Sequence, residues 1–143
     1  MVLFVPFDGG ELSVAALERA VEFSTVLEEP VVAVTVVRSK NAEYAREAGW
    51  LDADESYDLD TIVERLREQV AAVSPDVEFR YETVDRYAPT GTVSKRIKQL
   101  VHDRDVSLVV IGSDNAGHVV TSISSVGGSV AGGTYDVMIV RSP

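Results

Sequence analysis

The sequence predicts one α/β domain with a doubly wound, five-stranded parallel sheet and helices on both faces. Short apolar runs alternate with longer segments of helical periodicity in the order β-α-β-α-β-α-β-α-β, which favours parallel strands joined by crossover helices. The second run, Val31–Val37, is apolar and β-branched throughout, as expected of a strand that is covered on both faces. At 143 residues the chain is long enough for one domain with a substantial core.

The first strand and the first helix are marked by the residues that end them. The apolar run Val2–Val5 stops at Pro6, which indicates a buried strand followed by a turn. Residues Glu11–Leu27 then place apolar side chains at helical spacing, with charged side chains on the opposite face. Pro30 ends that segment. A helix is therefore expected before Pro30 and the second strand after it.

The most irregular part of the chain is Ser39–Asp58. A short helix is expected over 42–48, and Trp50 is the aromatic that would anchor this surface insertion. Four acidic side chains follow Trp50, namely Asp52, Asp54, Glu55 and Asp58. Carboxylates are ligands of hard divalent cations, but the pattern of a dedicated calcium loop is missing. A solvated acidic loop is therefore the favoured interpretation, with a cation site as the alternative.

The second half of the chain continues the alternation of helix and strand. Leu59–Val73 carries the clearest apolar stripe, and Val77–Thr83 alternates strictly, which indicates an edge strand with one wet face. Thr92 is expected to cap the next helix, and Val106–Ile111 to form a buried strand. His118–Ala131 has the apolar spacing of a last helix, although it is poor in helix formers.

Composition limits the classes of function. Thirteen Lys and Arg stand against 23 Asp and Glu, a formal net charge of −10, which disfavours nucleic acid as a partner. The chain has no cysteine, so a disulfide framework, a thiolate metal site and a cysteine nucleophile are excluded. No signal peptide or membrane-length apolar run is found, so the expectation is a cytoplasmic protein with no membrane partner. Between an ordinary acidic protein and one adapted to high salt, we favour the second as a hypothesis.

The stretch Ile111–Gly117 bears most directly on function. It follows an apolar run, and a buried strand that ends in Gly-Ser before a helix is a common way for α/β proteins to hold phosphate. Ligands of doubly wound sheets bind at the carboxyl ends of the strands. Asp8 follows the first strand, Val36–Arg38 closes the second and Gly112 follows the fourth, so these residues are expected at one edge of the sheet.

Taken together, the motifs resemble those of the universal stress proteins, within the larger group of adenine-nucleotide α-hydrolase-like folds. The resemblance covers nearly the whole chain and rests on Phe4–Gly9, Val34–Val37, Gly91, Leu108–Ser113 and Val137–Val140 in that order. It implies strand order 3-2-1-4-5 and an adenine nucleotide, ATP or AMP with Mg²⁺, as ligand. By the same resemblance, Asp8 would contact the adenine ring, Val36 would lie beside it, and Gly112 would approach the ribose and phosphates.

The chain departs from the family's phosphate pattern after Gly112. Asn115 stands where a second glycine is expected, with the nearest glycine displaced to Gly117, and Ser124-Ser125 stands in place of a Gly-Ser or Gly-Thr pair. Each replaced glycine adds a side chain close to the expected anion, although Asn tolerates left-handed backbone and Ser125 could donate to phosphate. The candidate nucleotide-binding residues are therefore Asp8, Val36, Gly112, Ser113, Asn115, Gly117, Ser124 and Ser125.

Two functional interpretations remain open at this point. The favoured one is a non-catalytic, cytosolic regulatory or stress-response protein with weak or absent adenine-nucleotide binding and no required cofactor. The alternative is an ATP- or AMP-binding switch, with slow hydrolysis. A structural role is also open for Asp8, which could cap the first helix or its turn, and for Gly112, which could serve only a tight turn. The serines after Gly112 lack a His–carboxylate pair in any known nucleophile motif, so a hydrolase triad is not expected.

The last strand suggests how the protein assembles. Val137–Val140 is apolar throughout, and the strand order implied by the resemblance makes it an edge. An apolar edge strand invites pairing with another chain. We therefore expect a homodimer through antiparallel contact of these strands, as the resemblance also implies.

Overall fold

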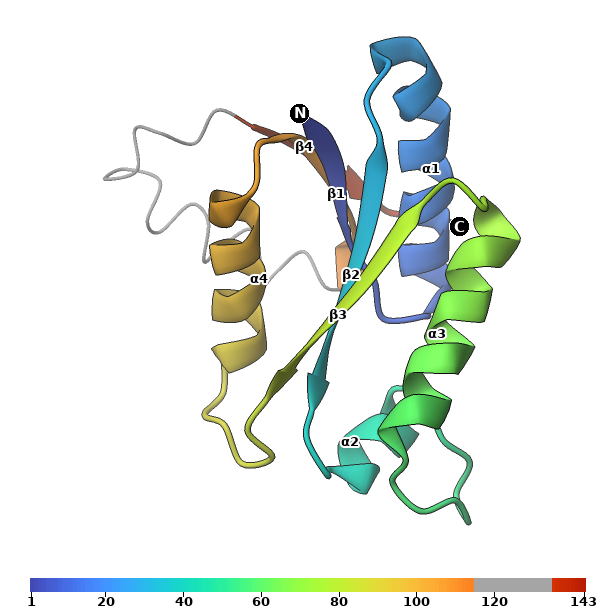
Figure 1. Ribbon diagram of the computed structural model, residues 1–143, viewed down its shortest axis with the longest axis vertical. Helices are drawn as coiled ribbons and strands as arrows, with labels where there is room; N and C mark the ends of the chain where they lie inside the picture. The colour runs from blue at the N-terminus through green and yellow to red at the C-terminus, as the bar shows by residue number, and fades with distance from the viewer. Residues whose placement is uncertain (115–134) are drawn as a thin grey trace.

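The computed structural model describes residues 1–114 and 135–143, and it has the predicted architecture (Figure 1). The elements are β1 (Val2–Pro6), α1 (Glu11–Leu27), β2 (Val31–Arg38), α2 (Ala42–Glu47), α3 (Leu59–Val73), β3 (Glu78–Val84), α4 (Thr92–Asp103), β4 (Val106–Gly112) and β5 (Asp136–Val140). The strands form a five-stranded parallel sheet in the order β3-β2-β1-β4-β5, which confirms the predicted fold class and strand order. Among the described residues no helix is long and apolar enough to cross a membrane.

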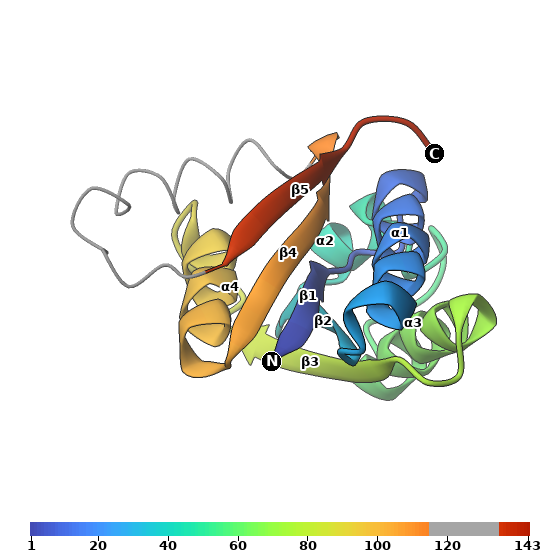
Figure 2. The ribbon, with the colours of Figure 1, turned by 90° about the horizontal axis from the view of Figure 1, so that it is seen from above.

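The sheet separates two apolar cores, because successive side chains of a strand point to opposite faces. Leu3 and Val5 of β1 lie in the larger core with α1 and α3, whereas Phe4 lies in the smaller core with Ile97 and Val101 of α4. Figure 2 shows α1 and α3 together on one side of the sheet and α4 on the other. The central strands β1, β2 and β4 are therefore buried on both faces, as their apolar composition predicts.

The ends of the helices follow local rules. Asp58 caps α3 by accepting hydrogen bonds from the backbone N–H groups of Asp60 and Thr61, at 3.0 and 3.3 Å. The expectation that Thr92 caps α4 is wrong. The cap is Gly91, whose φ of 90° suits a residue without a side chain, and the Thr92 hydroxyl donates instead to the Pro89 carbonyl at 2.7 Å.

The boundaries of the strands differ from the predictions by one residue. β3 begins at Glu78 and runs to Val84, where it pairs with Arg38 at the end of β2. Likewise β4 extends to Gly112, which pairs with Val140 of β5. β3 and β5 are the two edges of the sheet, as expected. The predicted last helix, His118–Ala131, lies outside the described residues.

Candidate functional site

A cleft of about 330 Å³ opens at the carboxyl ends of β1 and β2. Its floor is formed by Pro6 at the end of β1 with the next two residues, Phe7 and Asp8, and by four residues of β2: Val34, Thr35, Val36 and Arg38. Tyr44 and Trp50 of the insertion form one wall, and the segment from Thr90 through the first turns of α4 forms the other. This is the edge at which parallel sheets bind ligands, and the volume is that of a small-molecule pocket.

Asp8 has a structural role in this cleft. One carboxylate oxygen accepts a hydrogen bond from the backbone N–H of Gly10 at 2.8 Å and so closes the turn between β1 and α1. Gly9 in that turn has a φ of 82°, and a Cβ there would lie 2.6 Å from the Gln69 side-chain oxygen. Asp8 therefore fixes the turn, as one of the two open interpretations held, and lines the cleft as well.

Trp50 is the anchor of the insertion, as the sequence predicted. Its side chain is buried, and its indole N–H donates to the backbone carbonyl of Asp8 at 2.7 Å. The Tyr44 ring meets the indole edge-on, with the ring centroids 5.7 Å apart. This contact brings the end of β1 and the insertion, 42 residues apart in the chain, into one wall of the cleft.

Charged groups of opposite sign flank Tyr44. Burial raises the pKa of its hydroxyl, Arg38 opposes that rise, and Asp8 adds to it. The Arg38 guanidinium carbon lies 5.4 Å from the centre of the Tyr44 ring, and a guanidinium nitrogen donates to the Ala88 carbonyl at 2.8 Å. The tyrosine is therefore neutral at physiological pH, and its hydroxyl can donate a hydrogen bond.

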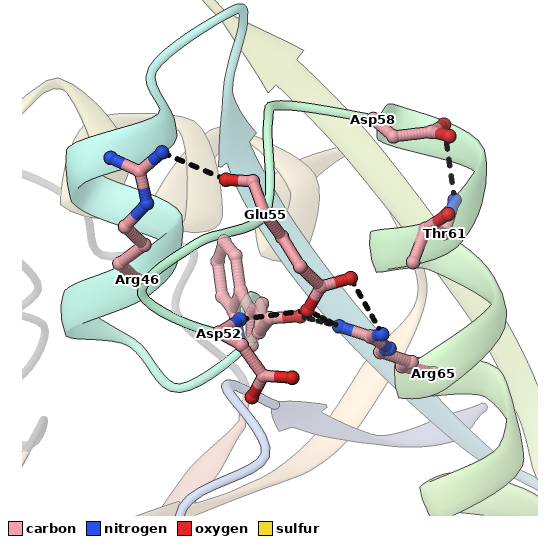
Figure 3. Close-up of polar contacts among 7 residues, drawn as sticks. Arg46, Asp52, Glu55, Asp58, Thr61 and Arg65 are labelled. Carbon is pink, nitrogen blue, oxygen red and sulfur yellow. Dashed lines mark hydrogen bonds and ion pairs between the residues drawn. The ribbon is translucent and has the colours of Figure 1, made fainter.

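Arg65 of α3 holds the insertion in place from behind the cleft wall. Its guanidinium donates to both carboxylate oxygens of Glu55, at 2.8 and 2.9 Å, and to the backbone carbonyl of Trp50 at 2.9 Å. Figure 3 shows Arg65 reaching Glu55 from one side while Arg46 of α2 donates to the Glu55 backbone carbonyl from the other, at 2.7 Å. We call Glu55, Arg65 and Arg46 the clasp.

The electrostatics of the clasp are those of a two-pronged ion pair. The hydrogen bonds from Arg65 lower the pKa of the Glu55 carboxyl from 4.5 to about 2, with a further contribution from the backbone N–H of Asp52. Glu55 therefore stays ionised throughout the ordinary pH range. Because both side chains are partly exposed, salt weakens the pair.

The cation alternative for the acidic segment finds no support in its geometry. Glu55 is engaged by Arg65, and Asp58 caps α3. Within residues 1–114 and 135–143, no three His, Cys, Asp or Glu side chains gather in a way that could hold a metal ion.

Gly112 is used for close packing against α1. A Cβ on Gly112 would lie 2.8 Å from the Cβ of Leu12 and 3.0 Å from its carbonyl carbon. Its φ is not in the left-handed region, so a tight turn is not what requires a glycine here. In the described part of the chain, the space beside Gly112 is taken by the first turn of α1, and Gly112 does not line the cleft.

The structure thus brings together only some of the residues predicted for the site. Asp8 and Val36 line the cleft, whereas Gly112 and the half-buried Ser113 do not. Asn115, Gly117, Ser124 and Ser125 lie outside the described residues. Sequence reasoning placed Arg38 at this edge of the sheet without counting it among the nucleotide-binding residues, and it missed Tyr44 and the residues at the start of α4. Arg38 was signalled by its place at the end of the second strand, and Gly91 by its position before a helix.

A five-stranded parallel sheet of this order, with helices on both faces and a cleft at the carboxyl ends of its first two strands, defines the class of doubly wound α/β domains. Within that class the chain belongs to the universal stress protein family, whose model matches residues 1–141. A comparison with curated proteins found no significant match.

Three solved structures illustrate the likeness. A universal stress protein in complex with cAMP is 20% identical, with 99% of this chain and 96% of that chain covered and a TM-score of 0.56. The universal stress protein from Archaeoglobus fulgidus in complex with dAMP is 16% identical, with 99% and 98% covered and a TM-score of 0.54. The universal stress protein UspA from Lactobacillus plantarum is 21% identical, with 99% and 97% covered and a TM-score of 0.51. At these identities the likeness concerns the fold.

Proposed function

We propose that this universal stress protein is a non-catalytic regulatory protein that binds an adenine nucleotide weakly in the cleft at the ends of β1 and β2. The observation that carries the proposal is the cleft itself, an apolar-walled space of about 330 Å³ at the strand ends, floored by Asp8 and Val36. Support comes also from two proteins of the same fold that were solved with cAMP and with dAMP.

The walls of the cleft suit a flat heteroaromatic base. Val34, Val36 and Ile97 offer apolar surface from β2 and α4, and the rings of Trp50 and Tyr44 line the same cleft. Asp8 and the Tyr44 hydroxyl add polar groups at the rim of that apolar surface. A few polar groups in a mostly apolar cleft are what fixes the orientation of a small ligand.

Weak binding is proposed because the chain offers little to a long phosphate chain. From Gly112 to Asp136 the sequence contains no lysine or arginine, and Asp114 adds a negative charge. A triphosphate would depend on backbone N–H groups and Mg²⁺, in a protein with a net charge of −10. We therefore expect nucleotide to act as a reversible regulatory ligand, not as a substrate.

Calorimetry tests this proposal. Titration of the protein with adenosine, AMP and ATP, each with and without Mg²⁺ and in high salt, should give dissociation constants from high micromolar to millimolar and no release of phosphate from ATP. Asp8→Asn keeps an oxygen for the Gly10 N–H but removes the charge, and should weaken binding. Asp76→Asn removes the same charge far from the cleft and should not. Absence of binding by all three compounds would refute the proposal, and steady ATP turnover would refute its non-catalytic part.

We propose further that the protein is a homodimer paired through β5. Ile139 of this edge strand is 39% exposed, and Val137 and Met138 are half-buried beside it. Light scattering at micromolar concentration should give twice the mass of the chain, and Ile139→Lys should give monomers. A wild-type monomer would contradict the proposal.

A further inference from the structure

Arg38 stands out among the residues that line the cleft. It is the only cation among the lining residues in the described part of the chain. Six other arginines there form ion pairs with carboxylates, whereas none of the ion pairs between described residues involves Arg38. One terminal nitrogen donates to the Ala88 carbonyl at 2.8 Å, so the side chain is held in place and its other donors are left for a ligand.

Two hydroxyl groups lie on the same side of the cleft. Thr90 and Ser94 line the opening, and neither hydroxyl makes a hydrogen bond to another residue that the structure describes. The bond from Arg38 to Ala88 fixes the guanidinium against the loop that carries Thr90. Gly91 lies between the two hydroxyl residues, and no described atom comes within 4 Å of the position of its absent Cβ. The wall is therefore open at this point, with donors around it.

We propose that Arg38, Thr90 and Ser94 form an anion subsite that binds the phosphoryl group of a monophosphorylated ligand. A guanidinium with free N–H groups matches the oxygens of a phosphate, and hydroxyl donors from a second element complete the contact. This subsite lies on the β2–α4 side of the cleft, away from the loop after β4. The inference rests on the proposed function for the remainder of the ligand, which is a nucleoside.

Charge sets the size of the anion. Asp8 lines the same cleft, and the protein as a whole carries a net charge of −10, so each added negative charge on a ligand meets repulsion. One guanidinium can make a two-pronged contact with one phosphoryl group and offsets part of its charge. We therefore expect AMP to bind more tightly than adenosine, and ATP to gain nothing further over AMP.

The test uses the full-length protein and three probes: adenosine, AMP and inorganic phosphate. Arg38→Met removes the guanidinium, and Arg86→Met removes an arginine that does not line the cleft and so controls for net charge. Calorimetry should show AMP affinity falling about tenfold to a hundredfold in Arg38→Met, the range expected for lost charge-assisted hydrogen bonds, with adenosine unchanged. Inorganic phosphate should shift the amide resonances of Gly91 and Ser94 in the wild type and in Arg86→Met, but not in Arg38→Met.

A second variant covers the case in which Arg38→Met unfolds. The double variant Thr90→Val, Ser94→Ala keeps Arg38 and its hydrogen bond to Ala88. It should weaken the binding of AMP several-fold and leave the binding of adenosine unchanged. If adenosine and AMP bind equally in the wild type, the subsite is refuted and the proposed function stands. If phosphate shifts the two amides but no nucleoside or nucleotide binds, the proposed function fails and the subsite stands. If phosphate has no effect, the subsite is refuted.

Discussion

The two walls of the cleft differ in how they are held. The wall formed by the insertion is held by several hydrogen bonds: Trp50 donates to Asp8, and Arg65 and Arg46 hold Glu55 behind it. The wall at the start of α4 carries Thr90 and Ser94, whose hydroxyls find no partner among the described residues. Beside it, Arg38 at the end of β2 has one hydrogen bond, to Ala88, and a ring contact with Tyr44. Most polar groups behind and within the insertion wall are bonded inside the fold, whereas the hydroxyls of Thr90 and Ser94 make no bond to a described residue.

This difference separates stability from binding within one cleft. Substitutions in the bonded wall should lower the free energy of unfolding, because each removes buried contacts or leaves a buried polar group unpaired. Substitutions in the open wall should leave the free energy of unfolding nearly unchanged and alter affinity for small anions. The following predictions concern the bonded wall and the packing beside it, in order of expected size.

Trp50→Ala should have the largest effect. It removes a buried indole, its edge contact with Tyr44 and the hydrogen bond to Asp8, so a loss of about 3–5 kcal/mol in the free energy of unfolding is expected. Urea denaturation, followed by circular dichroism, measures it. Tyr87→Ala is the matched control, because Tyr87 is 79% exposed and should change stability by less than about 0.5 kcal/mol. Equal effects of the two variants would show that the insertion is not bonded to the body.

Gly112→Ala should cause the second-largest loss of stability, because the new Cβ meets the backbone of α1 as well as the Leu12 side chain. Backbone cannot yield as a flexible side chain does, so we expect a loss of about 1–3 kcal/mol from overpacking. Gly49→Ala is the comparison: its φ of 81° imposes strain of about 1 kcal/mol, but no described atom lies within 4 Å of the added Cβ. Denaturation midpoints measured at fixed salt compare the loss of stability in the two variants. A smaller loss for Gly112→Ala than for Gly49→Ala would contradict close packing at β4.

Thr35→Val should lower the free energy of unfolding by less than Gly112→Ala does. The buried Thr35 hydroxyl donates to the Phe7 carbonyl at 2.6 Å and ties β2 to the end of β1. Valine has the same shape without the donor, so a loss of about 1–2 kcal/mol is expected from the unpaired carbonyl. Thr90→Val makes the same chemical change in the open wall and should be neutral by thermal denaturation. Destabilisation by both changes to the same degree would remove the distinction between the walls.

The clasp should give the smallest effect and a dependence on pH. The pKa of Glu55 is lowered from 4.5 to about 2 in the folded protein, so its stabilisation is fully present above pH 4.5 and is lost as the pH falls toward 2. The melting temperature of Glu55→Gln should lie below that of the wild type at neutral pH, and the two curves should converge in acid. Glu64→Gln, in an exposed pair with Arg67, should follow the wild type at every pH. If the melting temperatures of the two proteins stayed equally far apart in acid, ionised Glu55 would be excluded as the source of the pH dependence.

The sequence predicted the fold well because its signals are local. Apolar runs, helical periodicity and breakers such as Pro30 define each element from its own residues, and alternation of strand and helix then leaves few topologies. Asp8 and Val36 were found in the same way, since the carboxyl end of a strand is visible in sequence. Gly91 was mistaken for a residue outside the cap because Thr92 is the better capping residue by composition, whereas the cap required a positive φ.

The remainder of the cleft depends on long-range contacts that no local pattern contains. Trp50 was expected to anchor its segment, but nothing in the sequence says that its partner is the Asp8 carbonyl, 42 residues away. The family resemblance implied that Gly112 approaches a ligand, with a tight turn as the open alternative. Close packing against a helix was not considered, because a glycine after a buried strand looks the same in sequence in each of these roles. The close approach of Gly112 to Leu12 is visible only in three dimensions.

The two edges of the sheet have a consequence for assembly. β3 exposes charged side chains along its length, among them Glu78 and Arg80, whereas β5 carries one charge, at its first residue Asp136, and continues with four apolar residues, Val137–Val140. A sheet with two apolar edges could add copies at both and grow into an open-ended ribbon. A sheet with one charged and one apolar edge can pair only once, so association through β5 would end at two copies. The charged side chains along β3 would therefore limit the size of such an assembly, besides giving the strand one solvent-exposed face.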